Sequence, residues 1–474
     1  MAIVDLSKAT QSINMNDFRL VEFDAVDGAP TATDWSWLSS SGADVDIKGN
    51  SMIFDGEGRA LAGNVTEIRI DAGNNSAALP DVLITGLNAP AAHIADGAID
   101  FWTILSGNDT ITGPRLVNVG ANARFTLFGD GILSAAGQTT GGNDILNVGN
   151  ARVTAYGDVV ELDNGIPFAG DRAALTIFTG GNDVIVGEQT TLEQILVGDV
   201  ARVHSATSLV GGNDEITIAS SAATSVVYGD AVSIDKTNGD RIEVFGGQDR
   251  IYAHPDSKAM LVGDVGLQEA NSIVHGARDE IYGDQQGTTI VGDVFNNLGG
   301  EVVGGNDVLN GNGGADILVG DVHMSSGGKI TGGGDAIFGG EGSDQIYGDV
   351  LQATNTQVIG GNDQIYGDAG DDFLYGQGGH DLLEGGQGND RMEGGTGNDQ
   401  YFMDSYGDTI VENASEGYDT VLTWLNDVGL GANVENLTYI GTGNFKGGGN
   451  SLSNYITGGA GSDIFIADAS GNDI

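Results

Sequence analysis

The chain has 474 residues, of which 80 are glycine and none is cysteine, and its formal net charge at pH 7 is −49. So much glycine is unusual for an ordinary globular domain, and the lack of cysteine excludes both a disulfide framework and a thiol nucleophile. The negative charge argues against nucleic acid or anionic lipid as a partner, and it makes the chain repel itself unless cations neutralise it.

No segment has the roughly 18 uninterrupted apolar residues of a membrane-spanning helix, so no membrane span is expected. The segment from Met1 to Lys8 lacks the basic and apolar regions of a cleaved signal peptide. Export would therefore need another route.

Residues 1–105 are predicted to form a small β-rich N-terminal cap domain. Apolar and polar residues alternate at 45–48, 65–71 and 80–85, which predicts short strands. Such a cap would cover the open edge of a stack of coils, and an independent β domain is the alternative. Tryptophans belong to the expected core of the cap, with a surface that stacks on sugar rings as the alternative role for Trp35, Trp37 and Trp102.

Residues 106–303 are expected to form irregular, long-period coils of a β-solenoid. Two aspartate motifs alternate here and continue to residue 363. The first motif is Gly-Gly-Asn-Asp or a variant, with its aspartate at Asp109, Asp144, Asp183, Asp214, Asp249, Asp279, Asp307, Asp335 and Asp363. The second is apolar-x-Gly-Asp, with its aspartate at Asp130, Asp158, Asp199, Asp230, Asp264, Asp293, Asp321 and Asp349. For the second series, metal ligation and simple turn geometry both remain open.

The spacing of these motifs predicts stacked coils. The last four aspartates of the first series are 28 residues apart, and each second-series aspartate between them follows 14 residues after its predecessor. Short β-prone triplets precede Gly-Asp, which predicts three-residue strands that stack in a right-handed parallel coil at 195–197, 226–228, 260–262, 317–319 and 345–347. Each 28-residue module is interpreted as a two-sided coil enlarged by about ten residues such as 322–331. A third face and a protruding hairpin are both open for those residues.

Four aspartates, Asp372, Asp381, Asp390 and Asp399, stand nine residues apart in an unbroken run of glycine-rich nonapeptides from 367 to 402. The pattern is G-G-x-G-x-D-x-U-x, where U is apolar. Glycines at the first, second and fourth places are expected to adopt positive φ and turn backbone carbonyls toward an ion, and the sixth-place carboxylate completes the cage. Calcium suits such an irregular set of oxygens better than magnesium, while zinc and copper favour His or Cys.

Residues 405–474 are predicted to be a C-terminal β segment with one further nonapeptide around Asp463. The chain stops at Gly471–Ile474 in the middle of what looks like another repeat. We therefore expect a chain that is truncated there.

With these motifs, the sequence resembles the repeats-in-toxin (RTX) family of haemolysin-type calcium-binding repeat proteins. The resemblance is strongest over 304–404 and implies a parallel β-roll that binds several calcium ions. It implies sixth-place ligands at Asp316, Asp344, Asp372, Asp381, Asp390, Asp399 and Asp463. Together with the first-series aspartates and the turn glycines, the predicted metal site also includes Asp307, Asp335, Asp363, Gly339, Gly342, Gly385, Gly388, Gly394 and Gly397. The resemblance further implies type I secretion from a Gram-negative bacterium, although this chain ends before a C-terminal export signal is recognisable.

Calcium is expected to control folding. If each site binds with a Kd of ~10⁻⁴ M, millimolar calcium contributes roughly 1.4 kcal/mol per site. Ten independent sites would contribute about 14 kcal/mol, comparable to the net stability of a whole domain. The repeat region is therefore expected to be largely unfolded at cytosolic calcium.

Catalysis finds little support in the sequence. Neither H-E-x-x-H nor G-x-S-x-G occurs, and paired carboxylates without a distinct scaffold do not identify a glycosidase. We expect an all-β, secreted or cell-surface calcium-binding protein with a structural or adhesive role and leave its enzyme status open. The alternatives are a polysaccharide-active enzyme and a carbohydrate-binding module, so that extracellular polysaccharide is the candidate partner besides calcium.

Overall fold

The computed structural model describes the strands between 3 and 140 by their backbone, and then residues 142–467 except 150–151, 159–160, 163–176, 188–192, 204–207, 221, 223–224, 235–241 and 271. Two compact units span 1–240 and 241–474. Every regular element among the described residues is a β-strand. Within the described part of the chain, no helix is long and apolar enough to cross a membrane.

The first unit begins with an antiparallel sheet. Its strands neighbour one another in the order β2 (Phe23–Val26), β3 (Asp34–Ser39), β4 (Asp44–Phe54), β5 (Ala60–Asp71), β6 (Val82–Pro90) and β1 (Ile3–Asp5). The strands expected at 45–48 and 65–71 lie within β4 and β5, and the described part of the segment expected at 80–85 lies within β6. The boundary at residue 105 stays a prediction. The side chains of Trp35, Trp37 and Trp102 lie outside what the structure describes.

The rest of the first unit consists of parallel sheets. One contains β7 (Thr110–Thr112), β10 (Ile145–Gly149), β14 (Val184–Gly187) and β18 (Glu215–Ile218), and a second contains β8 (Arg124–Phe128), β11 (Arg152–Tyr156), β15 (Gln194–Val197) and β19 (Val226–Tyr228). Two smaller sheets contain β12 (Glu161–Leu162), β16 (Val200–Val203) and β20 (Ala231–Ile234), and β9 (Gln138–Thr140), β13 (Ile177–Thr179) and β17 (Ser208–Val210). Each chain turn thus adds one strand to every sheet.

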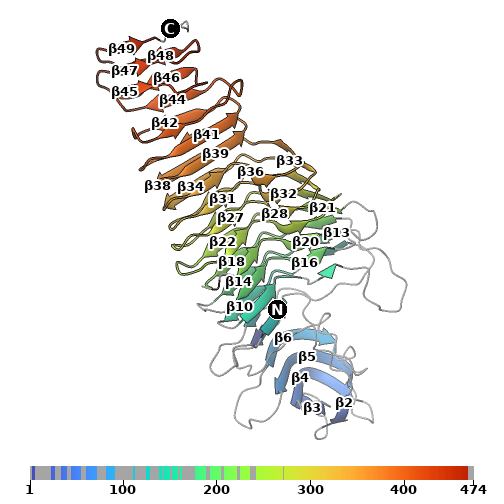
Figure 1. Ribbon diagram of the computed structural model, residues 1–474. Helices are drawn as coiled ribbons and strands as arrows, with labels where there is room; N and C mark the ends of the chain where they lie inside the picture. Colours follow the sequence, from blue (N-terminus) through green and yellow to red (C-terminus); the bar gives the residue numbers. More distant parts are fainter. Residues whose placement is uncertain are drawn as a thin grey trace. The chain divides into compact units, whose positions relative to one another are not determined.

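The second unit has the same organisation, with one parallel sheet along each side of its coils (Figure 1). The first sheet contains β22 (Arg250–Ala253), β26 (Glu280–Tyr282), β30 (Val308–Asn310), β34 (Ala336–Glu341), β38 (Gln364–Ala369), β40 (Leu382–Glu384), β42 (Gln400–Met403), β44 (Thr420–Thr423), β46 (Asn436–Tyr439) and β48 (Tyr455–Thr457). The second contains β23 (Met260–Val262), β27 (Thr289–Val291), β31 (Ile317–Val319), β35 (Gln345–Tyr347), β39 (Phe373–Gly378), β41 (Arg391–Thr396) and β43 (Thr409–Ile410).

The additional residues of the 28-residue modules form two further parallel sheets. One contains β24 (Val265–Gln268), β28 (Val294–Asn297), β32 (Val322–Ser325) and β36 (Val350–Ala353). The other contains β21 (Ile242–Phe245), β25 (Ser272–His275), β29 (Glu301–Val303), β33 (Lys329–Thr331) and β37 (Gln357–Ile359). Residues 322–331 thus supply β32 and β33, which pair with the coils before and after them.

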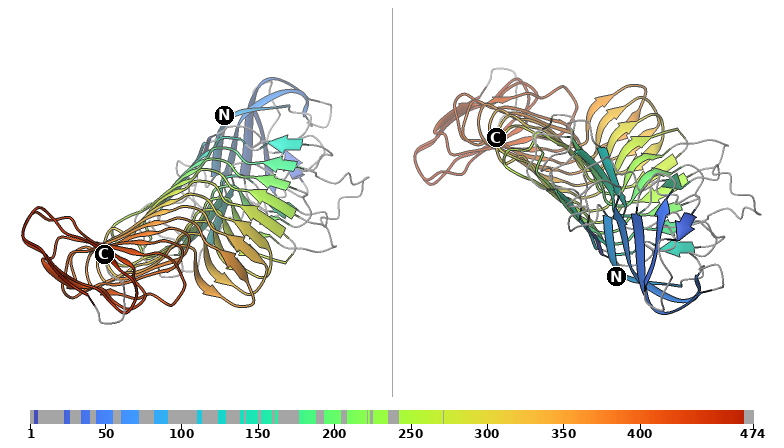
Figure 2. Two further views of the ribbon diagram at one scale, coloured as in Figure 1. Left: turned by 90° about the horizontal axis from the view of Figure 1, so that it is seen from above. Right: turned by 90° about the horizontal axis from the view of Figure 1, so that it is seen from below.

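Beyond β37 the coils become two-sided, because successive strands then alternate between the first two sheets alone. Figure 2 shows the extra lobe of the yellow and orange coils, which the red coils lack. The last coils add a short parallel sheet of β45 (Asp427–Gly429), β47 (Lys446–Gly448) and β49 (Ile464–Ile466). The all-β, parallel β-roll or solenoid architecture predicted from the sequence is confirmed.

The core of the second unit is a row of apolar side chains, one from the middle of each strand. Ile365, Leu383 and Tyr401 follow one another in the first sheet, and each has no exposed surface. Leu374 and Met392 do the same in the second sheet. These are the eighth-place residues of the nonapeptides, and burying each contributes about 1.5–3 kcal/mol. The sixth-place aspartate stands two residues before each of them, at the corner of the coil.

Candidate metal centre

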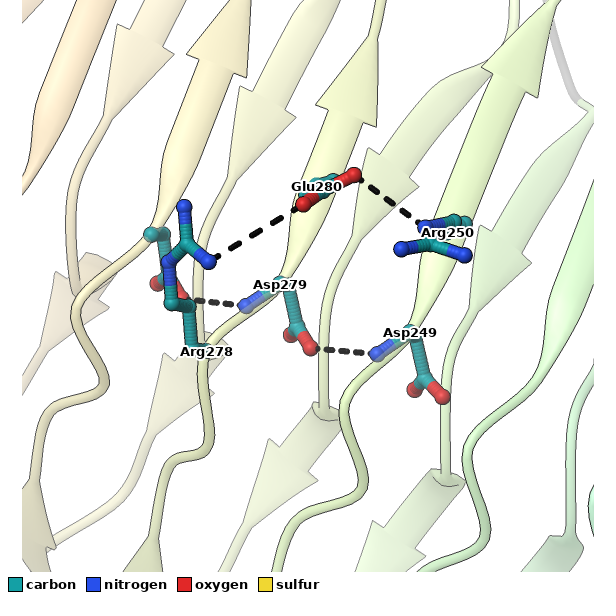
Figure 3. A network of polar contacts seen from close by, with 6 residues as sticks. Asp249, Arg250, Arg278, Asp279 and Glu280 are labelled. Atoms are coloured by element: carbon teal, nitrogen blue, oxygen red, sulfur yellow. Dashed lines mark hydrogen bonds and ion pairs between the residues drawn. The ribbon is translucent and has the colours of Figure 1, made fainter.

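Aspartates at the corners of successive coils are joined by hydrogen bonds into a column. The backbone N–H of each donates to Oδ1 of the aspartate in the next coil, as from Asp307 to Asp335 at 2.7 Å and from Asp335 to Asp363 at 2.9 Å. Figure 3 shows the same contact between Asp249 and Asp279, beside an exposed ion pair of Arg250 with Glu280. The column continues through the nonapeptides to Asp381, Asp399 and Asp419.

A second column of aspartates begins after β30 in the second unit. Asp316 donates its N–H to Asp344 Oδ1 at 2.8 Å, Asp344 donates to Asp372 at 2.8 Å, and Asp372 donates to Asp390 at 2.9 Å. The column ends at Asp408, whose Oδ1 accepts the N–H of Asp390. Alternate nonapeptides thus contribute to alternate columns, one on each side of the two-sided coil.

The other carboxylate oxygen of these aspartates is buried and has no hydrogen-bond partner. This is true of Oδ2 in Asp307, Asp316, Asp335, Asp344, Asp363, Asp372, Asp381, Asp390 and Asp399. No more than 2% of the surface of any of these residues is exposed. Burying an ionised carboxylate without a partner is strongly unfavourable, so these positions call for a cation.

The glycine at the first place of each nonapeptide leaves space next to that oxygen. A Cβ on Gly367 would lie 2.6 Å from Asp372 Oδ2 and 2.5 Å from the carbonyl oxygen of Gly385 in the next coil. The same two kinds of oxygen surround Gly376, where Asp381 Oδ2 and the carbonyl oxygen of Gly394 are 2.3 and 2.8 Å away. A carboxylate and a backbone carbonyl therefore converge on one small space, which fits a hard cation such as calcium.

Glycine has a different role at each place of the repeat, and the expectation of positive φ at the first place is wrong. Positive φ occurs at the second place, as in Gly386 with 85°, and at the fourth place, as in Gly388 with 156°, but not at the first-place Gly385. The second place also accepts Asp368 and Gln377 in the left-handed region. The fourth place requires glycine because a Cβ on Gly388 would lie 1.6 Å from a carbonyl oxygen in the preceding coil. The first-place glycine is needed for space.

Burial raises the pKa of the corner carboxyls in the ion-free fold. The pKa rises to about 8 for Asp316, about 7 for Asp372, about 8 for Asp381 and about 6 for Asp390, with loss of hydration as the largest cause and neighbouring carboxylates adding to it. Burial likewise raises the pKa of Asp363 to about 9, and the like charges of Asp349 and Asp381 add to this rise. A divalent cation would reverse this preference for the protonated form.

The second aspartate series is buried beside the first. Asp321 Oδ1 accepts the N–H of Gly333 at 2.8 Å and Asp349 Oδ1 accepts the N–H of Gly361 at 2.7 Å, so each fixes the turn that begins the next coil. Asp321 Oδ2 has no hydrogen-bond partner and no exposed surface. In the first unit, one carboxylate oxygen each from Asp183, Asp199 and Asp214 lie within 4.8 Å of one another. The second-series aspartates therefore stabilise turns, and metal ligation by them stays a prediction.

Three positions depart from the pattern or escaped the sequence reasoning. Asp463 accepts the N–H of Phe445 through Oδ1 at 2.9 Å but is only half-buried. Asp408 and Asp419 continue the two columns and were not predicted, although each is followed two residues later by an apolar side chain as in the repeats. Asp109 and Asp130 lie outside the described residues.

Stacked parallel coils with an unpartnered carboxylate at each corner define a cation-binding β-roll. The sequence model of the RTX calcium-binding nonapeptide repeat matches this chain in four copies, at residues 304–322, 330–350, 360–383 and 373–401. The segment 304–401 therefore belongs to the RTX repeat family, whose repeats bind Ca²⁺, and four copies imply several ions. No curated protein and no solved structure matches the chain significantly.

Proposed function

We propose that this is a secreted calcium-binding protein whose coils fold when calcium enters the two aspartate columns. Its ligands are the sixth-place and first-series aspartates together with the carbonyl oxygens of the turn glycines. The set comprises Asp307, Asp316, Asp335, Asp344, Asp363, Asp372, Asp381, Asp390, Asp399 and Asp463 with Gly339, Gly342, Gly385, Gly388, Gly394 and Gly397.

The observation that carries this proposal is the row of nine buried Oδ2 atoms without a partner. Without a cation, each must either be protonated or leave an unpaired charge in the interior, and both options weaken the fold near neutral pH. A ligand that binds only the folded form stabilises it by mass action. At millimolar calcium and a Kd of ~10⁻⁴ M, the gain is roughly 1.4 kcal/mol per site.

Folding that requires calcium with such a Kd would fail in the cytosol and proceed outside the cell. Cytosolic calcium lies far below such a Kd, whereas extracellular calcium lies above it. A chain that stays unfolded inside the cell and folds outside suits export, and proteins with RTX repeats are typically secreted. We place this protein in the extracellular space or at the cell surface, with export by the type I route.

A structural or adhesive role suits the folded form better than catalysis. A groove of about 610 Å³ lies at the step from four-sided to two-sided coils and is lined by Val358, Ile359, Asn362, Gln377 and His380 among others. Its lining, drawn from the described residues, contains no tryptophan, tyrosine or phenylalanine. Sugar rings stack on aromatic faces, so this groove does not favour the polysaccharide-active alternative.

The test is circular dichroism and size-exclusion chromatography of the full chain in excess chelator and in 5–10 mM calcium, concentrations of roughly 50–100 times the assumed Kd. We expect an expanded, largely unstructured chain in chelator and a compact β-structure in calcium. Full β-structure in chelator would contradict calcium-driven folding. Incubation of the calcium-loaded protein with a panel of extracellular polysaccharides tests the role, because retention without turnover supports adhesion and turnover defeats it.

A further inference from the structure

Glu412 takes the place of a repeat glycine at the end of the nonapeptide run. Strand β43 pairs with β41 so that Thr409 and Ile410 lie beside Arg391 and Met392. Val411 extends this register, because its N–H donates to the carbonyl oxygen of Met392 at 2.9 Å. One residue further on, Glu412 therefore lies beside Gly394 of the preceding coil. Gly394 lies in the same way beside Gly376 of the coil before it.

This substitution changes what faces Asp399, the last sixth-place aspartate of the run 367–402. At Asp381, the neighbouring oxygen comes from the carbonyl of Gly394. At Asp399, the side chain of Glu412 provides a carboxylate. One oxygen each from Asp399, Glu412 and Asp419 lie within 4.8 Å of one another.

All three carboxylates are buried, with exposed fractions of 1% for Asp399, 6% for Glu412 and 1% for Asp419. Oδ2 of Asp399 and Oε2 of Glu412 have no hydrogen-bond partner. None of the ion pairs among the described residues involves any of the three. Three negative groups are thus held together in the interior without a cationic side chain, which is very unfavourable unless something neutralises them.

Tyr401 fixes the orientation of the glutamate. Its hydroxyl accepts the N–H of Gly394 at 2.6 Å and donates to Oε1 of Glu412. The tyrosine has no exposed surface, so its ring is held by the core. Because Oε1 is occupied in this way, Oε2 is left for a ligand. Asp419 is fixed similarly, since its Oδ1 accepts the N–H of Asp399 at 2.9 Å.

We propose that Asp399, Glu412 and Asp419 form a divalent-cation site outside the nonapeptide pattern, which binds calcium more tightly than the sites between repeats. The inference rests on the calcium binding proposed above. Calcium affinity rises with the number of charged ligands and the rigidity of the site, and here three carboxylates stand where Asp381 meets one backbone carbonyl. Oxygen-only ligands in an irregular arrangement favour calcium over zinc or magnesium. This site would fill first and order the coil that closes the repeat run.

A shared proton is the competing explanation for the cluster. In that case Glu412 is neutral and acts only as a hydrogen-bond acceptor for Tyr401. Glutamine has nearly the same shape as a protonated glutamate and keeps the oxygen that Tyr401 needs. The variant Glu412→Gln therefore preserves a proton-held cluster and weakens a cation site.

The experiment is calcium titration of the full-length protein by calorimetry, with terbium luminescence as a second readout. We expect wild type to show a tight class of about one ion in addition to the weaker repeat sites. Glu412→Gln should weaken the tight class by at least about tenfold and leave the weaker class unchanged. The matched control Glu341→Gln, which removes an exposed carboxylate in β34, should change neither, and Asp390→Asn should affect the weaker class alone.

Tyr401→Phe adds a second measurement, terbium emission, which would not change if Glu412 had only a structural role. Tyrosine close to terbium sensitises its emission, so this variant should lose emission from the tight class while calorimetry still detects the ion. An unchanged tight class in Glu412→Gln, or a single class of sites in wild type, would overturn the inference while leaving calcium binding by the repeats intact. If wild type took up no calcium at all, the proposed function would fail with it. Should Glu412→Gln not fold even in saturating calcium, the Tyr401→Phe emission decides, and undiminished emission rejects the site.

Discussion

Asp363 donates its backbone N–H to Oδ1 of Asp381 at 2.9 Å across a step of 18 residues, and it accepts the same bond from Asp335 across a step of 28. The column is therefore continuous through the change from four-sided to two-sided coils. What the two kinds of coil share is the corner, where a glycine turn is followed by an aspartate and then by a buried apolar residue. The first-series aspartates of the long coils thus share this corner and its hydrogen-bonded column with the nonapeptide aspartates.

Replacing Asp381 by asparagine should destabilise the fold in calcium and stabilise it in chelator. In 1 mM calcium, the variant loses one ion and with it roughly 1.4 kcal/mol of unfolding free energy at a Kd of ~10⁻⁴ M. In chelator at pH 8, it removes a buried carboxyl that burial disfavours in its ionised form, so the residual structure should increase. Urea unfolding in calcium measures the loss, and the circular dichroism signal of the β-structure in chelator measures the gain.

The control for this variant is Glu341→Gln, which changes the charge equally at an exposed position in β34. It should shift the free energy of unfolding in calcium by less than about 0.5 kcal/mol and leave the circular dichroism signal in chelator unchanged. If Asp381→Asn lowered both the stability in calcium and the residual β-structure in chelator, the carboxylate would serve packing and not an ion.

The fourth-place glycine should tolerate substitution far less than the second-place glycine. In Gly388→Ala, the new methyl group would meet the carbonyl oxygen of Gly370 in the preceding coil, which forces the coils apart. We expect a loss of about 3 kcal/mol or more. Gly386→Asn should cost less, about 1–2 kcal/mol, because Asn312 and Asp368 adopt the same left-handed φ of 68° and 69° at this place, although the new Cβ would lie 2.2 Å from the carbonyl oxygen of Asp368. Thermal unfolding in saturating calcium compares the two, and equal losses would contradict the assignment.

Much of this fold can be predicted from local sequence, because the repeat is short and each coil contacts only its neighbours. The nine-residue spacing of Asp381, Asp390 and Asp399 predicts a corner aspartate, and the apolar residue two positions later predicts the core. Burial and hydrogen bonding of these residues agree with both predictions. The 28-residue period likewise predicts stacked coils.

Other features depend on contacts between coils that are invisible in one repeat. The first-place glycine was expected to need positive φ, whereas Gly385 is required because a Cβ would meet Asp390 Oδ2 at 2.4 Å. Glu412 was missed because its position depends on the register of β43 against β41, and no motif surrounds it. The side on which residues 322–331 lie also required the pairing of β32 and β33 with their neighbours.

Magnesium and sodium should not replace calcium in folding the chain. The candidate sites combine carboxylate and backbone carbonyl oxygens from two coils, and magnesium resists such irregular coordination and gives up its water reluctantly. Sodium screens exposed charges but offers little to a buried oxygen. In ion-free protein, 10 mM magnesium or 0.5 M sodium chloride, chosen as roughly saturating conditions, should restore less than about a quarter of the β-structure that calcium restores. Equal recovery in sodium chloride would mean that general charge screening is enough.

The ion-free protein should become more folded on acidification, opposite to the usual acid denaturation. Burial raises the pKa of Asp381 to about 8 and that of Asp363 to about 9 in the folded form, while the unfolded value is about 3.9. Between those values the folded form binds more protons than the unfolded form. Stability from these groups is therefore fully present below about pH 4 and is lost progressively as the pH rises from there to the folded pKa values of about 8 and about 9.

Calcium should remove this dependence, because the bound ion needs ionised carboxylates and competes with protons. Calcium binding at pH 6–7 should release protons, which calorimetry detects as a heat that depends on the ionisation enthalpy of the buffer. Circular dichroism of protein freed of calcium by gel filtration should show more β-structure at pH 5 than at pH 8, and calcium should abolish the difference. If the ion-free chain instead loses structure between pH 8 and pH 5, the corner carboxylates are already ionised and paired without calcium, and the role assigned to their unpartnered oxygens is wrong.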